Sequence, residues 1–326
     1  MEAREIQRLG RSVSVVGLGT WQLGADWGDV DEQRAHAILD AAVAEGVTFF
    51  DTADVYGDGR SERFCGELHE HHSGVLIATK MGRRGEQLLE NYASRENLWS
   101  WNARSIENLG MAPLDLVQLH SPPDPVYGSD EVFELLDELV SSERIRAYGV
   151  SVETSEQALR AIERPNVATI QIILNCFRLK PLEEVLPAAQ VAGVGIIARV
   201  PLASGMLSGR FDETTTFAAS DHRNYNRGGE AFDVGETFSG VPYEVGLAAV
   251  AELRELLDPG MSLAQFALRW VIDQPGVSTV IPGASSVEQV RQNVAAAALE
   301  PLLERQHAGV REIYDRLIRP HVHARW

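Results

Sequence analysis

The sequence contains very little lysine. Of its 29 basic residues only two, Lys80 and Lys180, are lysines, and the other 27 are arginines. Arginine stays protonated in proteins, whereas a buried lysine shifts its pKa readily. A position that keeps lysine in such a chain is therefore a candidate for proton chemistry.

Cysteine is also scarce, and long apolar runs are missing. Two cysteines, Cys65 and Cys176, cannot form a disulfide framework, which is typical of a protein from a reducing compartment. No run approaches the roughly 18 apolar residues that span a bilayer. The first ten residues, MEAREIQRLG, lack the apolar core of a signal peptide. We therefore expect a cytoplasmic protein that does not enter a membrane.

The sequence has fewer basic than acidic residues. The 326 residues include 47 acidic against 29 basic side chains, so the net charge is −18. A nucleic-acid surface needs a basic stripe, and an anionic membrane repels a chain of this charge. We therefore exclude both as partners. With 44% hydrophobic and 23% charged residues, the composition is that of an ordinary globular protein.

Short apolar runs recur along the chain and alternate with amphipathic stretches. Eight runs predict strands near 14–19, 47–51, 75–80, 114–119, 145–150, 168–173, 194–199 and 277–282. Continuous apolar runs favour parallel strands that are buried on both faces. Eight such strands alternating with helices predict a single (β/α)8 barrel domain over residues 1–326.

An open, doubly wound sheet is the alternative architecture. It would need a G-x-G-x-x-G turn leading from the first strand into a helix, but GLGTWQLG at 17–24 runs into Trp21 and Gln22 instead. The closed barrel is therefore favoured.

Helices are expected at 31–45, 95–109, 243–257, 261–273 and 302–318. Asp31 is the expected N-cap of the first helix, and Gly46 its expected C-terminal stop. About eighty residues separate the seventh and eighth strands and include the polar, Gly-rich stretch 211–241. A connection of this length is usually functional or mobile.

Polar residues stand at the ends of several predicted strands. Asp51 ends the second, Lys80 the third and His120 the fourth, Ser151 follows the fifth, and Tyr56 lies in the loop after Asp51. In a barrel, these ends meet at one mouth. Because a neighbouring ammonium lowers the pKa of a tyrosine, Lys80 and Tyr56 together suggest a proton donor, with Asp51 holding the ammonium. Taken singly, each residue fits a structural ion pair or hydrogen bond equally well.

The segments GVTFFDTADVYGDGRSER, IATK, LVQLHSP, YGVS and VIPGASSVEQVRQN, in this order and spacing, resemble the aldo-keto reductase superfamily. The resemblance covers nearly the whole chain and includes the N-terminal hairpin pattern REIQRLG. It implies a (β/α)8 barrel that reduces aldehydes or ketones with NADPH, or with NADH, bound without a Rossmann domain.

The resemblance also implies roles for individual residues. Tyr56 would protonate the carbonyl oxygen, Lys80 and Asp51 would tune Tyr56, and His120 would orient a small carbonyl substrate. Trp21 would wall the substrate side. The residues expected around the cofactor are Thr20, Trp21, Ser151, Gln171, Arg199, Pro201, Leu202, Ser204, Gly205, Leu207, Arg210, Gly283, Ser285, Ser286, Gln289 and Asn293.

The sequence departs from its relatives at three places. Val152 stands where relatives often carry the Asn that follows the strand-five Ser. Arg199 and Val200 stand where many relatives place a Tyr that stacks on the nicotinamide. A guanidinium can also stack on a flat ring, but it brings a charge. Gly283 and Gln289 replace the basic clamp of the 2′-phosphate, which leaves Ser285, Ser286 and Arg291 for that role.

Weaker features have two interpretations each. Cys65, His69, His71 and His72 could bind a metal, although a solvated helix face is the favoured interpretation. The side chains of Trp27, Trp99 and Trp101 could line the pocket or pack the loops. His321 and His323, near the C-terminus, suggest no function.

The predicted function is NAD(P)H-dependent reduction of a carbonyl compound. Two alternatives remain from the sequence: a lyase that forms a Schiff base at Lys80, and a cofactor-sensing regulatory subunit that resembles potassium-channel β subunits. The oligomeric state is not predicted.

Overall fold

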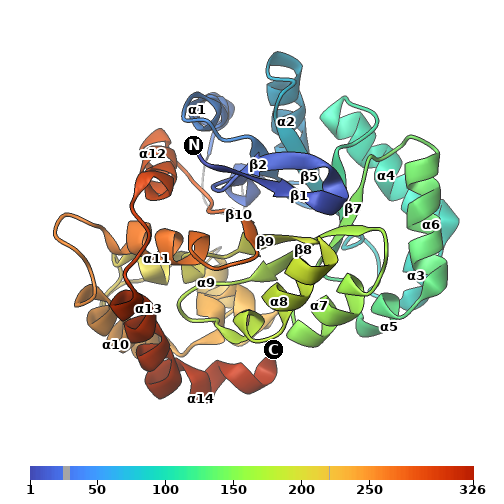
Figure 1. The fold of residues 1–326 in the computed structure, drawn as a ribbon. Coiled ribbons are helices and arrows are strands. Elements are labelled where there is room, and N and C mark those ends of the chain that lie inside the picture. Colours follow the sequence, from blue (N-terminus) through green and yellow to red (C-terminus); the bar gives the residue numbers. More distant parts are fainter. Residues whose placement is uncertain (25–29, 220) are drawn as a thin grey trace.

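The computed structural model describes residues 1–24, 30–219 and 221–326. Within these residues, eight parallel strands follow one another around a barrel (Figure 1). Bridges from Val16 to Val280 and from Gly19 to Gly283 join the first of these strands to the last. The strands are β3 (Leu18–Gly19), β4 (Phe49–Asp51), β5 (Leu76–Met81), β6 (Leu116–His120), β7 (Tyr148–Ser151), β8 (Val167–Ile173), β9 (Gly195–Arg199) and β10 (Val277–Val280). The predicted (β/α)8 barrel is confirmed.

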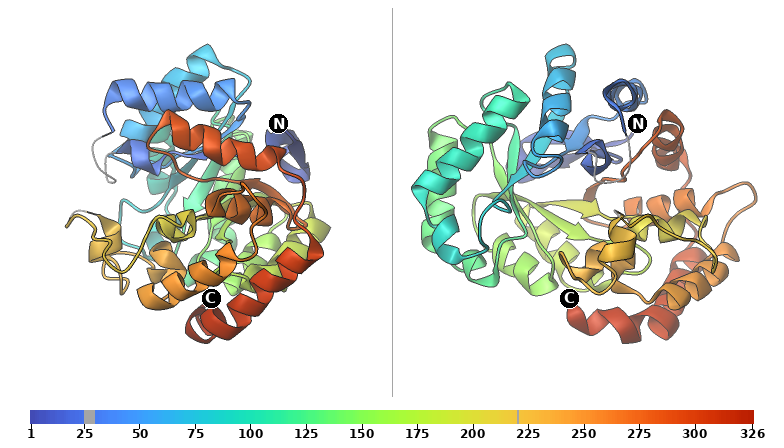
Figure 2. Two further views of the ribbon diagram at one scale, coloured as in Figure 1. Left: turned by 90° about the vertical axis from the view of Figure 1, so that its left-hand side faces the viewer. Right: turned by 180° about the vertical axis from the view of Figure 1, so that it is seen from behind.

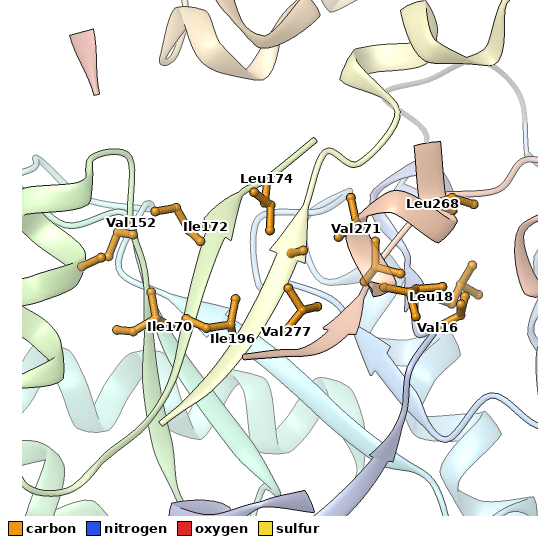
Figure 3. Packing of buried hydrophobic residues seen from close by; sticks show 14 of the residues in the cluster. Val16, Leu18, Val152, Ile170, Ile172, Leu174, Ile196, Leu268, Val271 and Val277 are labelled. Atoms are coloured by element: carbon orange, nitrogen blue, oxygen red, sulfur yellow. The ribbon is translucent and has the colours of Figure 1, made fainter. Parts of the chain in front are cut away.

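The strands are buried on both faces, as their apolar sequences predict. Every residue of β8 and β9 is buried. Because side chains alternate along a strand, Ile170, Ile172 and Ile196 face the helices while their neighbours face the barrel interior. Figure 3 shows Ile170 and Ile172 near Val152, and Ile196 near Val277 of β10, in one cluster of buried residues.

Helices surround the strands (Figure 2). The first, α1, is capped at its N-terminus by Asp31, whose carboxylate accepts a hydrogen bond from the Arg34 amide. Gly46, which has a φ of +88°, follows its C-terminal end. The helices of the described residues are α1 (Glu32–Ala44), α2 (Arg60–His71), α3 (Leu89–Tyr92), α4 (Arg95–Leu109), α5 (Asp124–Tyr127), α6 (Asp130–Ser141), α7 (Ser155–Ile162), α8 (Val185–Ala192), α9 (His222–Tyr225), α10 (Tyr243–Arg254), α11 (Leu263–Ile272), α12 (Val287–Ala295), α13 (Glu304–Ile313) and α14 (Arg319–Val322).

An N-terminal hairpin closes the end of the barrel where the strands begin. It consists of β1 (Ala3–Ile6) and β2 (Arg11–Ser14). Ile6 and Val13 are buried in one cluster with Phe49, Leu76 and Leu116, each the first residue of its strand. The opposite end, where the strands finish, is therefore the open mouth.

The long connection from β9 to β10 carries most of the irregular structure. It contains the 3-10 turns η4 (Ala203–Ser208), η5 (Val234–Glu236) and η6 (Phe238–Gly240) and then α10 and α11. The helix predicted at 302–318 is α13, continued by the π-helical turn η8 (Tyr314–Ile318). In the part of the chain that the structure describes, we find no helix with the length and apolarity needed to span a bilayer.

Candidate active site

Strand alternation brings six polar side chains together inside the mouth. Asp51, Lys80, His120, Ser151, Gln171 and Arg199 lie at or near the carboxyl ends of six neighbouring strands, β4 to β9. Residues two positions apart along a strand point to the same side. The same inward face is apolar at its start, with Phe49, Leu76 and Leu116, and becomes polar towards the mouth. From the strand ends, the sequence had predicted four of these residues, Asp51, Lys80, His120 and Ser151, to lie at one rim.

Lys80 is held by three oxygen atoms. Its Nζ donates to Asp51 Oδ1 at 2.5 Å, to the Thr52 carbonyl at 3.0 Å and to the Tyr56 hydroxyl at 3.3 Å. The side chain is only 1% exposed. Burial opposes the charge, but the Asp51 carboxylate outweighs it, so the pKa of Lys80 is raised above its ordinary value. Lys80 is therefore a fixed ammonium behind Tyr56.

Two amides hold the second oxygen of Asp51. Gln171 Nε2 donates to Asp51 Oδ2 at 2.7 Å, and Gln118 Nε2 donates to the same atom at 3.1 Å. Gln171 was expected at the cofactor, and Gln118 was not predicted from the sequence. Gln118 lies two residues before His120 on the same inward face of β6, so strand alternation could have identified it.

Tyr56 lies at the deep end of the mouth, in the turn after β4. Its ring stacks beside Trp21, with centroids 6.0 Å apart, and meets His120 edge-on at 5.9 Å. Burial is the largest influence on this hydroxyl and raises its pKa above the ordinary value, while Lys80 lowers it. The expected effect of the ammonium is present, but it only partly offsets the burial of the ring.

His120 is a neutral imidazole. Burial, together with Arg83, Lys80 and Arg199, lowers the pKa of His120 well below its ordinary value. Its Nδ1 atom is buried and has no hydrogen-bond partner among the described residues. A neutral ring that faces Tyr56 can donate one hydrogen bond without carrying a charge into the mouth.

Arg199 is clamped between two carboxylates. Its Nη2 donates to Glu153 Oε2 at 2.9 Å and to the Val152 carbonyl at 3.0 Å, and its Nη1 donates to Glu236. Burial opposes the charge of Arg199, but the two carboxylates raise its pKa above the ordinary value. The guanidinium identified in the sequence as a departure from the relatives is therefore paired.

A cavity of about 710 Å³ opens from this mouth. One end is walled by Trp21, Tyr56 and His120, and the other reaches the start of α12. Of the residues predicted at the cofactor, those that line the cavity are Thr20, Trp21, Ser151, Gln171, Arg199, Pro201, Leu202, Ser204, Gly205, Arg210, Gly283, Ser285, Gln289 and Asn293.

Three other residues predicted near the phosphates lie outside this lining. Leu207 is fully buried in the core. The Ser286 hydroxyl caps α12 by accepting from the Gln289 amide at 3.2 Å. Arg291 is exposed and pairs with Glu45. The part of the cavity beside α12 is therefore lined by neutral polar groups.

Several residues that line the cavity were not predicted from the sequence. The most polar are Arg83, Arg223 and Glu236, and Phe232 meets Trp21 edge-on at 6.0 Å. Arg83 follows Lys80 by three residues and could have been inferred from the end of β5. The other three lie in the long connection, where no periodic pattern marks the residues that face inward.

The cavity has the chemistry that a nicotinamide dinucleotide needs. Its lining includes Ser, Gln and Asn side chains beside the start of α12, a nine-residue helix, where anions bind favourably. Arg210 and Arg223 supply positive charge along the same cavity. Oε1 of Gln22, another lining residue, is buried with no hydrogen-bond partner among the described residues. These residues fit the predicted cofactor.

The other sequence features lie outside this site. Cys65 is buried, which raises the pKa of its thiol to about 12, and no metal-binding group of side chains occurs among the described residues. Trp99 and Trp101 lie on α4, where Trp99 packs on Arg95 and Trp101 on Tyr92. Trp27 lies outside the described residues.

Comparisons with known proteins agree with this geometry. A model of the aldo/keto reductase family matches residues 15–315. The aldo-keto reductase YhdN of Bacillus subtilis is 32% identical over 300 residues, which cover 89% of this chain and 87% of that protein. A probable voltage-gated potassium channel subunit beta of Oryza sativa is 30% identical over 316 residues, 93% of each chain. A crystal structure of an aldo-keto reductase from Klebsiella pneumoniae in complex with NADPH is 25% identical, covers 96% of each chain and has a TM-score of 0.71.

Proposed function

The chain belongs to the aldo/keto reductase family, and from this premise we propose that it reduces a small aldehyde or ketone to an alcohol, with NADPH as the hydride source and Tyr56 as the proton donor. One observation carries the proposal: the Asp51–Lys80–Tyr56 hydrogen-bond chain ends at the wall of a cavity of about 710 Å³ that is lined by polar groups suited to a dinucleotide. The same site would catalyse the reverse oxidation.

The proposed proton donor is Tyr56. NADPH, when bound, supplies the hydride, and the substrate oxygen then needs a proton. The Tyr56 hydroxyl faces the cavity and accepts a hydrogen bond from the Lys80 ammonium. This positive charge stabilises the phenolate that remains after proton transfer, which lowers the cost of the transfer. Asp51 keeps the ammonium in place and protonated.

His120 and Trp21 would position the substrate. The neutral His120 ring can donate a hydrogen bond to the carbonyl oxygen beside Tyr56, because its low pKa leaves it uncharged at neutral pH. Trp21, which stacks beside Tyr56, and Phe232 form an apolar wall of the cavity next to this polar pair. Such a wall suits the carbon skeleton of a small substrate.

The cofactor would lie along the rest of the cavity. Ser151 and Gln171 are placed to hold the nicotinamide carboxamide, and Arg210 is placed near the pyrophosphate. Gln171 donates its amide hydrogens to Asp51 and Gln118, which leaves its carbonyl oxygen as an acceptor. Ser285, Gln289 and Asn293 would hold the adenosine end.

The two alternative functions are less well supported. A Schiff base needs an accessible, neutral lysine, whereas Lys80 is buried and donates to three oxygens as an ammonium. The similarity to a potassium-channel subunit beta favours a regulatory role. That role would not require the Asp51–Lys80–Tyr56 chain to open onto a substrate-sized cavity, so we give reductase activity preference.

The test is an absorbance assay at 340 nm over a panel of aldehydes and ketones, with NADPH and NADH used separately. We expect oxidation of NADPH by at least one carbonyl compound. We expect Tyr56→Phe to lose about 10²- to 10⁴-fold in kcat, because the proton donor is gone, while the Kd for NADPH, measured by fluorescence, changes little. Full turnover by Tyr56→Phe would exclude the proton-donor role. Cofactor binding without turnover on any carbonyl would favour the regulatory alternative.

A further inference from the structure

Arg199 joins three segments of the mouth that are distant in sequence. It is the last residue of β9, Glu153 follows β7, and Glu236 belongs to η5 in the long connection. Arg199 and Glu236 line the cavity together with Ser151, Gln171 and Tyr56. The Arg199 side chain is 7% exposed, and those of Glu153 and Glu236 are 15% and 13% exposed. These charges therefore lie at the cavity wall and are mostly shielded from solvent.

The same contacts connect two departures from the family pattern. Val152 stands where relatives often carry Asn, and its carbonyl accepts a hydrogen bond from Arg199 Nη2 at 3.0 Å. The adjacent Glu153 accepts from the same nitrogen at 2.9 Å. Arg199 thus connects the end of β9 with the end of β7. The two departures from the family pattern, Val152 and Arg199, are therefore joined by a hydrogen bond.

The charged side chains around Arg199 are equal in number for the two signs. Arg83 pairs with Glu153 at 3.3 Å, and Arg178 donates to the Glu153 carbonyl at 2.8 Å. Asp233 acts on Arg178 and on Arg199 by charge. Three guanidinium groups therefore face three carboxylates in this charged cluster, which consists of Arg83, Arg178, Arg199, Glu153, Asp233 and Glu236. Removing one charge would leave an uncompensated charge of the opposite sign at the cavity wall.

We propose that Glu236, through its ion pair with Arg199 at the cavity wall, sets the relative affinity for the oxidised and reduced cofactor. This inference rests on the proposed function, because it requires a nicotinamide cofactor in the cavity. The carboxylates that pair with Arg199 offset the charge that would otherwise repel the nicotinamide ring in its oxidised, cationic form.

The sign of the effect follows from charge alone. The oxidised ring carries one more positive charge than the reduced ring. Glu236→Gln leaves the cluster with a net positive charge, which disfavours NADP⁺ relative to NADPH. Arg199→Gln leaves a net negative charge, which favours NADP⁺. The double variant is again balanced. Arg199 and Glu236 are therefore positioning residues, and a purely structural role would not give opposite signs.

The experiment measures Kd for NADP⁺ and for NADPH separately, by fluorescence titration, in four variants and the unmodified protein. The variants are Glu236→Gln, Arg199→Gln, the double variant and the control Glu213→Gln, which removes an exposed carboxylate from the same connection. We expect Glu236→Gln to raise the ratio of Kd for NADP⁺ to Kd for NADPH by about tenfold or more, because a unit charge near a shielded ring has at least this effect. Arg199→Gln should lower the ratio, and the double variant and Glu213→Gln should leave it unchanged.

Several results would overturn the inference. An unchanged ratio in Glu236→Gln, or a shift of the same sign in Glu236→Gln and Arg199→Gln, would show that the cluster does not act on the ring by charge. If Arg199→Gln does not fold, the comparison of Glu236→Gln with Glu213→Gln decides alone. Failure of the unmodified protein to bind either form would contradict the proposed function itself and this inference with it. If NADP⁺ and NADPH both bind but the ratio of their Kd values is unchanged in Glu236→Gln, only this inference is contradicted, and the proposed function is not.

Discussion

The retention of a lysine at position 80 has a geometric cause. Its single nitrogen donates to Asp51, Thr52 and Tyr56, which approach it from different directions. An ammonium has three donors around one compact centre, whereas the donors of a guanidinium lie in one plane. Arginine, which supplies 27 of the 29 basic residues, could not meet three oxygens in this arrangement without displacing Tyr56.

The ionisation of Asp54 should make the free energy of unfolding depend on pH. The carboxyl group is fully buried, and this burial, with Glu62 nearby, raises the pKa of Asp54 to about 7 against the pull of Arg84. The folded state therefore binds the proton more tightly than the unfolded state. Asp54 costs stability as the pH rises from about 4 to about 7, and the cost is constant above that range.

We predict that Asp54→Asn removes this cost. The free energy of unfolding should exceed that of the unmodified protein by roughly 2 to 4 kcal/mol at pH 8, and the difference should shrink towards zero near pH 4.5. Urea unfolding followed by circular dichroism across this range measures the difference. Asp58→Asn is the control, because the pKa of that fully exposed neighbour is lowered by Arg84. A difference for Asp54→Asn that does not vary with pH would contradict the prediction.

Regular strands made part of the site predictable. Asp51, Lys80, His120 and Ser151 could be placed together from the sequence, since strand ends meet at one rim and inward residues recur at every second position. Glu153, Phe232 and Glu236 could not be placed at the site from the sequence. Their orientation depends on turns whose geometry is set by contacts with distant residues, such as the Arg199 clamp, and local patterns do not record such contacts.

At the scale of elements, the connection from β9 to β10 covers the mouth with aromatic side chains. Phe232 meets Trp21 at 6.0 Å between ring centroids, and His222 lies 5.2 Å from the same indole. Phe217, on the same connection, packs instead against Phe211, Phe238 and Tyr243. One connection thus carries one aromatic residue at the cavity and another that does not line it.

We predict that Phe232→Ala raises KM for carbonyl substrates several-fold, because an apolar wall of the substrate end is lost. The Kd for NADPH and the thermal midpoint should change little, since Phe232 is only half-buried. Phe217→Ala is the matched control, and we expect it to lower stability by about 1 to 3 kcal/mol and to leave KM unchanged. Equal effects of the two substitutions on KM would contradict a substrate contact at Phe232.

The elements themselves were predictable to different degrees. The bounds of α4 and the presence of the eight barrel strands follow from period and composition, and Asp31 caps α1 as expected. The strand bounds were less predictable: the run at 14–19 was expected to be one strand, but β3 covers only Leu18–Gly19. The π-helical turn at Tyr314–Ile318 was not expected, because its residues continue a helical period without interruption. The short turns of the long connection were not expected either, since polar, Gly-rich sequences have no dominant period.

At the scale of the whole molecule, the net charge of −18 opposes an anionic cofactor. We therefore propose that binding depends on local groups that line the cavity, namely Arg210, Arg223 and the polar residues at the start of α12. We predict that NADPH at a hundredfold excess over its Kd stabilises the folded state by about 2.7 kcal/mol. For a chain of this size, the thermal midpoint rises by roughly 4 °C.

Differential scanning fluorimetry with NADPH, and with an equal concentration of adenosine as the control, measures this shift. Adenosine lacks the phosphates and the nicotinamide, so it should give a much smaller shift. An equal shift with both compounds would contradict a role for Arg210 and Arg223.

The burial of Lys80 also determines how the protein can be chemically modified. Reagents that acylate amines need an accessible, deprotonated nitrogen, and Lys80 offers neither because it is enclosed and held by Asp51. Lys180 is partly exposed and is the remaining lysine of the chain. Attachment of a fluorophore or a solid support through a lysine therefore occurs at one defined position and leaves the barrel mouth unmodified.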